Sequence, residues 1–355
     1  MIPAAIAVQR STDAKLMVVD ASGRLVHRPR ADLPALVHRG DLAIANDAAT
    51  LPASLFGIHA ATNSPIELRL AGRRSLQPQE VDRFTAVAFG AGDFRIPTET
   101  RPAPPSFRAG DVLQLGPLHA VVRTVLDHPR LIEVTFQGTP QDIWEGLARH
   151  GRPIQYSYLA DPLAVWDTWT KIASRPVAFE APSAGFLLDW RLIDRLRGRG
   201  ATFATLTHAA GISSTGDPNL DAKLPLDEPY EIPTRTANAI EVTRRQGGRI
   251  IAIGTTVVRA LEDAAACDGR VRSGRAVATL RVGPLSQLRV VDALATGQHE
   301  PGTSHYELLR AFQDNSVLQR VNAEADRHGY RTHEFGDSLF VCRAAALRVA
   351  EGHHP

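Results

Sequence analysis

The sequence predicts an α/β main domain into which a small antiparallel β-barrel or sandwich is inserted. Strand-like and helix-like segments alternate in residues 1–57 and again in residues 139–355. Between them, residues 58–138 hold short segments in which apolar residues recur at every second position, separated by Gly, Pro and Asp turns. With 355 residues the chain is long enough for two domains. We therefore expect a main domain of residues 1–57 and 139–355 and an inserted domain of residues 58–138.

Composition and charge are those of an ordinary globular protein. The chain is 44% hydrophobic and 22% charged, with a formal net charge of +2. A nearly balanced charge does not predict general nucleic-acid binding, which would need local clusters of Lys and Arg. Two isolated cysteines, Cys267 and Cys342, form no metal-binding pattern. Without an apolar run of about 18 residues or a leader-like N-terminus, we expect a cytoplasmic monomer with no metal and no membrane partner.

The N-terminal segment predicts strands at residues 16–20, 25–27 and 41–47. The last of these ends in the polar residues Asn46 and Asp47. Ligands of α/β folds bind at the carboxyl ends of strands, so both side chains are candidates for ligand binding. Capping of a turn is an equally good interpretation of the pair.

Alternating apolar residues mark the strands expected in the inserted domain, and helical periodicity returns after Gln141. The helix expected at residues 189–199 carries the densest group of basic residues. Its arginines form either a solvated helix face or a contact for phosphates. The barrel strands are expected at residues 66–70, 85–89, 112–115, 119–125 and 131–136, the helices at 142–150, 189–199, 234–246, 306–312 and 317–328, and the later strands at 202–207, 280–282, 288–292 and 338–342.

The stretch from Gly248 to Glu262 is the centre of the predicted site. Its apolar run, residues 250–253, is typical of a buried strand, and Gly254 permits a sharp turn after it. Thr255 and Thr256 then begin a helix with one apolar face. Free backbone N–H groups and the positive end of the helix dipole meet at this point, which favours a bound carboxylate or phosphate.

Charged and titratable residues surround this stretch. Arg259 lies one helical turn further on and would add a positive charge, and Glu262 would pair with Arg259 or with an amine of the ligand. The candidates for acid–base chemistry are His208, Glu228 and His299. Both histidines fall in loops after strands, where a merely solvated histidine is the alternative.

Motifs along nearly the whole chain resemble, in the same order, the S-adenosylmethionine:tRNA ribosyltransferase-isomerases of queuosine biosynthesis. The segment from Gly254 to Glu262 carries most of this resemblance. The other matching pieces are Leu33-Pro34, Gly40-Asp41-Leu42, Asn46-Asp47, Leu51-Pro52-Ala53, Leu55-Phe56-Gly57, Ala181-Pro182-Ser183-Ala184-Gly185, Val290-Val291-Asp292-Ala293-Leu294, Thr296 with His299 and Pro301, and Phe335-Gly336-Asp337.

The resemblance implies a barrel-like α/β main domain and a reaction on tRNA. In that reaction the ribosyl part of S-adenosylmethionine moves to a 7-aminomethyl-7-deazaguanine at the wobble position and rearranges, while adenine and methionine leave. S-adenosylmethionine is then the co-substrate, no metal is needed, and the tRNA anticodon is a partner. The resemblance assigns acid–base roles to His208, Glu228 and His299, and binding of S-adenosylmethionine or the nucleobase to Asn46, Asp47, Gly185, Gly254, Thr255, Thr256, Arg259 and Glu262. Arg259 is expected to anchor the methionine carboxylate.

Several positions depart from the family pattern. Ala48-Ala49 stands where the family has Thr-Arg, and Phe186-Leu187-Leu188 lacks the family's histidine. An Arg replaced by Ala loses a charge and a fork of donors. These departures leave two alternatives to the family reaction. One is a divergent paralogue that acts on S-adenosylmethionine or a related nucleoside with a small-molecule acceptor or water. The other is a binding protein that has lost catalysis.

Overall fold

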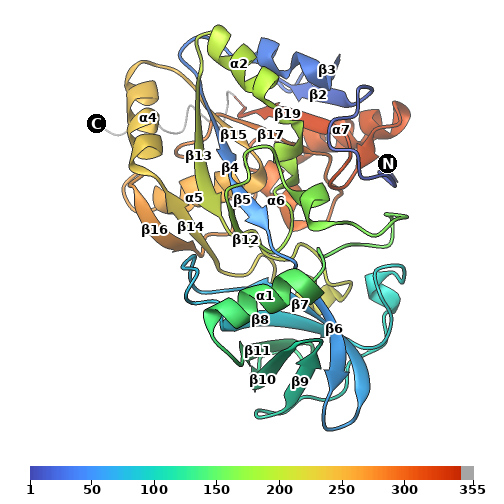
Figure 1. Ribbon diagram of the computed structural model, residues 1–355. Helices are drawn as coiled ribbons and strands as arrows, with labels where there is room; N and C mark the ends of the chain where they lie inside the picture. Colours follow the sequence, from blue (N-terminus) through green and yellow to red (C-terminus); the bar gives the residue numbers. More distant parts are fainter. Residues whose placement is uncertain (345–355) are drawn as a thin grey trace.

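An open, mixed sheet of nine strands forms the main domain of the computed structural model, which describes residues 1–344 (Figure 1). The prediction of an α/β main domain is confirmed. Its sheet does not close on itself, because β16 and β3 remain as edges, so the barrel-like shape belongs to the inserted domain alone. From edge to edge the strands are β16 (Gly274–Ala278), β14 (Glu228–Ile232), β13 (Thr202–His208), β4 (Leu42–Asn46), β15 (Ile250–Ile253), β17 (Ala293–Gly297), β19 (Ser338–Cys342), β2 (Lys15–Val19) and β3 (Leu25–Pro29).

The four central strands, β13, β4, β15 and β17, run parallel to one another. Their carboxyl ends therefore lie along one edge of the sheet, where polar residues follow each apolar run. That edge brings together Asn46 at the end of β4, His208 at the end of β13, Gly254 after β15 and Gly297 at the end of β17. The topology alone thus gathers segments from across the sequence at one place.

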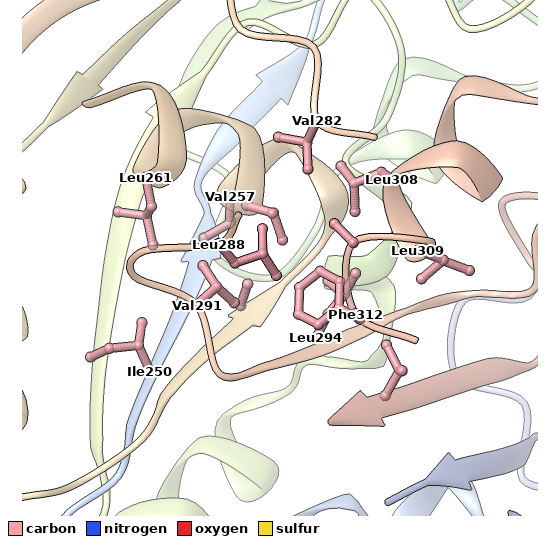
Figure 2. Packing of buried hydrophobic residues seen from close by; sticks show 14 of the residues in the cluster. Ile250, Val257, Leu261, Val282, Leu288, Val291, Leu294, Leu308, Leu309 and Phe312 are labelled. Carbon is pink, nitrogen blue, oxygen red and sulfur yellow. The ribbon is translucent and has the colours of Figure 1, made fainter. Parts of the chain in front are cut away.

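Helices cover both faces of this sheet. Successive residues of β15 point to opposite sides: Ile250 and Ala252 pack with α4, α5, α6 and α7, whereas Ile251 and Ile253 pack with α2. Figure 2 shows the first of these cores, where Val257 and Leu261 of α5 meet Leu294 and Phe312. The helices are α1 (Pro140–His150), α2 (Trp190–Gly198), α3 (Pro218–Asp221), α4 (Thr234–Arg245), α5 (Thr255–Ala264), α6 (Ser304–Leu309) and α7 (Asn315–Arg327), with 3-10 turns η1 (Arg30–Leu36), η2 (Thr98–Thr100), η3 (Val165–Thr168) and η4 (Ser183–Leu187).

The inserted domain is a closed antiparallel barrel of six strands, as the alternating pattern predicted, and it lies at one end of the main domain (Figure 1). Closure requires β6 to pass close to β9: a Cβ atom added at Gly57 would lie 1.9 Å from the carbonyl oxygen of Gln114. Ile143 and Leu147 of α1 pack into the barrel core. In barrel order the strands are β10 (Leu118–Val125), β11 (Leu131–Phe136), β8 (Arg83–Phe89), β7 (Ser64–Gly72), β6 (Ser54–His59) and β9 (Val112–Leu115).

The barrel strands span residues 54–136, and we propose domain boundaries close to the expected 58–138. Two short parallel pairs complete the fold: β1 (Ile2–Pro3) with β18 (Arg331–Thr332), and β5 (Ala48–Thr50) with β12 (Arg175–Ala178). Among the described residues, the longest helices are too short or too polar to cross a bilayer.

Two strands expected from the sequence are absent, and both predictions are wrong. Residues 280–282 and 288–292 are irregular, although they are as apolar as the strands beside them. Backbone groups of residue 280 and of residues 289–291 bond to buried side chains instead of to a neighbouring strand. The carboxylate of Glu262 accepts the N–H groups of residues 289–291, and Arg259 donates to the carbonyl of Leu280. Hydrogen bonds to side chains thus take the place of the backbone hydrogen bonds that a strand would make in a sheet.

Candidate active site

A cavity of about 820 Å³ lies at the carboxyl ends of the central strands. Segments that follow β13, β15 and β17 line it, and Thr98 and Glu99 of the inserted domain form part of its wall. The barrel loop rests directly on Gly216, where an added Cβ would lie only 2.4 Å from the backbone nitrogen of Glu99. The volume lies within the range of small-molecule sites, so we treat this cavity as the candidate active site.

The turn after β15 has the geometry that the sequence predicted. Gly254 has φ +102° and ψ 146°, and its N–H donates to the carbonyl of Ala295 at 2.8 Å. Residues with a Cβ rarely adopt this conformation. Helix α5 begins at the next residue, and Gly254, Thr255 and Thr256 all line the cavity. The positive end of the α5 dipole therefore faces the cavity, ready for an anionic group.

Replacement of Gly254 by Ala is expected to lower the free energy of unfolding by about 3 kcal/mol, because Ala must adopt a backbone conformation reserved for glycine. The matched control is Gly247→Ala. Gly247 has φ +74°, is exposed, and has nothing within 4 Å of an added Cβ. We expect this control to cost about 1 kcal/mol. Urea denaturation of both variants measures the difference, and equal losses would contradict the special role of the turn at Gly254.

Asn46 fixes the ends of the central strands relative to one another. Its Oδ1 accepts the N–H groups of His208 at 2.9 Å and Ala48 at 3.0 Å. Its Nδ2 donates to the carbonyl of His208 at 2.9 Å and to Oγ1 of Thr256 at 3.3 Å. The Asn46 side chain is buried and contacts the cavity only through Thr256. The structure thus gives Asn46 a positioning role in place of the predicted ligand contact.

Asp47 also acts within the protein. Its carboxylate accepts a hydrogen bond from the hydroxyl of Thr207 at 2.6 Å, and its carbonyl accepts the N–H of Ser174 at 2.8 Å. The residue is not part of the cavity wall. The turn-capping alternative fits Asn46, whose Oδ1 accepts the N–H of Ala48, whereas the carboxylate of Asp47 bonds to the neighbouring strand β13.

Arg259, Glu228 and His208 form a buried charged cluster beside the cavity. The Nη1 of Arg259 donates to Oε2 of Glu228 at 2.5 Å, and its other donors bond to the carbonyls of Leu280, Leu226 and Ala278 at 2.8–2.9 Å. Arg259 was predicted to anchor a ligand carboxylate. Its charge is instead neutralised by Glu228, although its side chain reaches the cavity wall.

His208 lies on the far side of Glu228 from the cavity. Its Nε2 is 3.2 Å from Oε2 of Glu228, the side chain is fully buried, and the residue is not part of the cavity wall. Burial, assisted by the positive charge of Arg259, lowers the pKa of His208 to about 3. Burial raises the pKa of Glu228, whose Oε1 accepts the N–H of Gly211 at 2.6 Å. The predicted acid–base residue His208 is thus neutral at physiological pH.

This protonation state predicts a pH dependence of stability. The folded-state pKa of His208 is depressed, so above pH 6.5 neither state binds the proton and the histidine has no effect. Between pH 6.5 and about 3 only the unfolded state binds it, and the free energy of unfolding falls as pH falls. From about pH 7.5 to 5.5 the wild type should lose about 1.4 kcal/mol more than His208→Gln in urea denaturation. Parallel pH dependences of the two proteins would contradict a neutral His208.

Two other predicted binding residues are directed away from the cavity. Glu262 is buried, and its carboxylate accepts the backbone N–H groups of Arg289, Val290 and Val291 at 2.7–3.0 Å. It therefore holds the irregular segment after β16 and neither reaches the cavity nor bonds to Arg259. Gly185 packs against the methyl group of Thr170, where a Cβ would lie 2.8 Å from that methyl, while the four residues before it line the cavity.

His299, like Glu228, is a predicted acid–base residue that lines the cavity. Its Nε2 is 2.8 Å from Oγ1 of Thr296, and its ring stacks on that of His305 with centroids 4.9 Å apart. Burial, together with the nearby His305 and His333, holds the pKa of His299 well below its usual range. A neutral His299 acts as a hydrogen-bond partner or as a base.

Sequence reasoning missed one wall of the cavity. Tyr156 and Tyr158 lie there with rings stacked at 5.9 Å, and their hydroxyls bond to Glu180 and Glu334 respectively. These residues come from irregular segments, which have no periodicity to detect. The spacing of the two tyrosines, with one residue between them, was the available signal, since it places both rings on one side of an extended chain.

The cavity wall is acidic. Seven carboxyl groups line it, against two guanidinium groups, those of Arg259 and Arg281, and no lysine. Arg259 is paired with Glu228, and Arg281 donates to the carbonyl of Lys223. This balance favours a ligand that carries positive charge. The seven are Glu99, Glu180, Asp221, Glu228, Glu300, Glu307 and Glu334.

Within residues 1–344, one group has the arrangement of metal ligands: His27, Glu324 and His328, none of which lines the cavity. The expectation that no metal takes part in the chemistry stays a prediction.

The fold and the site define an α/β protein with an inserted β-barrel and an acidic, nucleoside-sized cavity at the carboxyl ends of its central strands. The chain belongs to the queuosine biosynthesis protein family, whose sequence profile matches residues 2–341. This confirms the resemblance seen in the motifs.

Curated relatives match along almost their whole length. A protein of Sorangium cellulosum is 33% identical over 353 residues, with 92% of each chain covered. A protein of Gloeobacter violaceus is 33% identical, with 94% of this chain and 90% of the relative covered. Both are named S-adenosylmethionine:tRNA ribosyltransferase-isomerase. A crystal structure of S-adenosylmethionine tRNA ribosyltransferase from Thermotoga maritima is 23% identical, covers 93% of this chain and 92% of that chain, and has a TM-score of 0.48.

Proposed function

We propose that this protein is a cytoplasmic S-adenosylmethionine:tRNA ribosyltransferase-isomerase. It would transfer and isomerise the ribosyl part of S-adenosylmethionine onto 7-aminomethyl-7-deazaguanine in tRNA and release adenine and methionine. The observation that carries the proposal is the match of residues 2–341 to the queuosine biosynthesis family, supported by relatives of that name over more than nine-tenths of the chain.

The charges of the cavity support a cationic co-substrate. S-adenosylmethionine carries a sulfonium and an ammonium group, and the acceptor carries an amine, all of which are attracted by the seven carboxyl groups of the wall. The methionine carboxylate is the exception. The N–H of Gly254 is bonded to Ala295, and the N-terminus of α5 at Thr255 and Thr256 supplies a backbone site for this carboxylate, with no need for Arg259.

The roles of the predicted acid–base residues follow from their positions. We propose that Glu228 and His299, which line the cavity, contact the substrates, and that His208 supports Glu228 from behind. Neutral His299 accepts a proton or a hydrogen bond from the ribosyl group. No metal is assigned to these steps, and the protein is proposed to act as a monomer.

Helix α2 is the proposed contact for the tRNA backbone. It carries Arg191, Arg195 and Arg197, and Arg199 follows it. One guanidinium nitrogen of Arg195 and one of Arg199 also donate to the carbonyls of Ala31 and Val37, which holds the two groups in place without neutralising their charge. Contacts of this kind position a nucleic acid without reading its sequence.

A second candidate is the same chemistry with a small-molecule acceptor or water. The acidic wall favours it, because seven carboxyl groups repel the phosphates of an RNA strand near the cavity. The pair Ala48-Ala49, which stands where the family has an arginine, lies buried in β5 and removes a further positive charge.

The test is to incubate the protein with S-adenosylmethionine, with and without tRNA that carries the aminomethyl-deazaguanine, and to follow adenine and methionine by mass spectrometry. Release that requires this tRNA is the expected result. Release without tRNA would establish the second candidate. Binding of S-adenosylmethionine without release of either product would contradict both and indicate a binding protein.

A further inference from the structure

Tyr156 and Glu180 form a hydrogen-bonded pair on the cavity wall that none of the roles above uses. The hydroxyl of Tyr156 bonds to Oε1 of Glu180 and also lies 3.1 Å from the carbonyl oxygen of Ser214. The other carboxyl oxygen, Oε2, accepts the N–H of Ser213 at 3.1 Å. All four residues line the cavity. We call these two side chains the Tyr156–Glu180 pair.

The geometry allows this pair to gain or lose a proton without moving its heavy atoms. A phenol has one proton, and a carbonyl oxygen only accepts. When Glu180 is ionised, the Tyr156 hydroxyl donates to it. When Glu180 is protonated, the carboxyl donates to the phenol oxygen, which in turn donates to the carbonyl of Ser214. In both forms Tyr156 and Glu180 stay hydrogen-bonded to each other, as a preorganised acid–base group requires.

The groups around Glu180 raise its pKa so that a protonated form is present at neutral pH. Burial, with help from the negative charge of Glu334, raises the pKa of Glu180 to about 7, against the hydrogen bonds from Ser213 and Tyr156. Tyr158 stacks on Tyr156 and bonds to Glu334. The guanidinium group of Arg69 lies over the Tyr156 ring at 5.6 Å and is already paired with Glu67. Asp221 bonds to Ser214 at 3.2 Å.

The pair lies close to the proposed anchor for the co-substrate. Glu180 is followed by η4, and a Cβ atom added at Gly254 would lie 3.4 Å from Cβ of Ala184 in that turn. One short segment therefore connects the carboxyl group of Glu180 to the N-terminus of α5. A nucleoside held at Gly254 by its carboxylate has Glu180 on the adjoining wall of the same cavity.

We propose that Glu180, with Tyr156 as its hydrogen-bond partner, is the proton donor to the leaving adenine in the proposed reaction. The bond between the sugar and adenine breaks with both electrons going to adenine, and the carboxyl proton of Glu180 moves to a ring nitrogen of the base. The Glu180 carboxylate that remains accepts the Tyr156 hydroxyl. It regains a proton when the acceptor's ammonium group gives one up on forming its bond to the sugar.

The predicted acid–base residues are less suited to this step. His208 is sealed behind Glu228 and is neutral down to about pH 3. His299 also has a strongly lowered pKa, so neither imidazole is in the protonated imidazolium form that acts as a general acid at neutral pH. A carboxyl group with a pKa near neutrality, such as that of Glu180, is suited to act as a general acid at neutral pH.

The experiment measures the pH dependence of adenine release by Glu180→Gln and Tyr156→Phe. This inference rests on the proposed function, so the assay contains S-adenosylmethionine and the modified tRNA. Glu180 must be protonated, and the wild-type rate should therefore fall as pH rises through about 7. Glu180→Gln should lower kcat at least about 100-fold. It should also remove this fall in rate with rising pH, since an amide cannot transfer a proton as a general acid. In Tyr156→Phe the rate should fall at a higher pH than in the wild type, because loss of the hydroxyl destabilises the carboxylate of Glu180.

The matched control is Glu145→Gln on the exposed face of α1, where Glu145 pairs only with Arg149. Its rate and pH dependence should equal those of the wild type, and all variants should keep the wild-type dissociation constant for S-adenosylmethionine within about threefold. A Glu180→Gln protein with the wild-type pH profile would overturn the role of Glu180.

Titration of the Glu180 carboxyl by ¹³C NMR tests the pair independently of turnover. A midpoint near 7 in the wild type, and a higher one in Tyr156→Phe, is expected. An ordinary midpoint near that of a free glutamate, about 4.3, would also overturn the inference. A wild type that binds S-adenosylmethionine but releases no adenine with any acceptor would contradict the proposed function instead.

Discussion

Replacement of Arg259 by Met is expected to lower the free energy of unfolding by about 3–5 kcal/mol, the cost of leaving one partner of a buried ion pair uncompensated. The substitution removes the ion pair to Glu228 at 2.5 Å and the hydrogen bonds to the carbonyls of Leu280, Leu226 and Ala278. Each of these groups is then left in the interior without its donor. Urea denaturation at neutral pH measures the loss.

The double variant Arg259→Met/Glu228→Gln is the control that isolates the charge. Glu228→Gln leaves no unpaired carboxylate in the interior, and the amide oxygen of the new side chain can still accept the N–H of Gly211. We expect this double variant to recover at least about 1 kcal/mol relative to Arg259→Met alone. A double variant that is less stable than the single one would contradict an ion-pair role for Arg259.

The pH dependence of the single variant follows from Glu228. Burial already raises its pKa, and loss of Arg259 raises it further. An acid whose folded-state pKa is raised destabilises the fold above that pKa, and the penalty disappears as pH falls below it. The stability gap between Arg259→Met and the wild type should therefore narrow on acidification.

The same variant separates the two roles considered for Arg259. If Arg259 anchored the methionine carboxylate, its removal would raise the dissociation constant for S-adenosylmethionine at least about tenfold, equal to about 1.4 kcal/mol, and leave stability unchanged. Because the donors of Arg259 are engaged with the protein, we expect a large loss of stability and only a smaller loss of affinity for S-adenosylmethionine. Calorimetry at a temperature where the variant is folded measures the affinity.

Replacement of Asn46 by Ala is expected to cost about 3–5 kcal/mol. The Asn46 side chain satisfies both backbone groups of His208 and the N–H of Ala48, and these become unpaired in the interior. The loss of volume adds a cavity term at a side chain that is 2% exposed. Denaturation by urea or heat provides the measurement.

Asn46→Asp keeps the volume and both accepting bonds but places an oxygen against the carbonyl of His208. Repulsion should raise the pKa of the new carboxyl group, since only its protonated form donates to that carbonyl. Asn46→Asp should thus be unstable at neutral pH and recover as pH falls, whereas the deficit of Asn46→Ala should be independent of pH. Identical pH dependences for the two variants would contradict the hydrogen-bond network.

The features that the sequence predicted correctly are those set by local patterns. The run of Ile250 to Ile253, the glycine after it and the threonines that begin α5 specify a buried strand, a turn and a helix by neighbouring residues alone. The alternation in the inserted domain predicted antiparallel strands in a barrel or a sandwich, and the structure has the barrel.

The roles of individual side chains depended on partners far away in the sequence. Nothing local to α5 shows that Arg259 meets carbonyls 19 to 33 residues away, or that Glu262 holds the backbone of residues 289–291. The spacing of the two residues predicted an ion pair between them, yet both are buried and each bonds to other groups. Glu180 and Tyr156 escaped notice because they lie in irregular segments that only the assembled cavity brings together.

The contact between the inserted domain and Gly216 has a consequence for access. The wall contributed by Thr98 and Glu99 rests on a residue without a side chain, backbone against backbone. The inserted domain therefore covers part of the cavity, held there by this close contact and by the apolar packing of Ala71, Val87, Phe89 and Leu131 against Ile212, Leu220 and Leu224. A space of about 820 Å³ admits one nucleotide of a larger molecule at a time, so a tRNA would have to present its modified base extruded from the loop while the rest stays outside the cover.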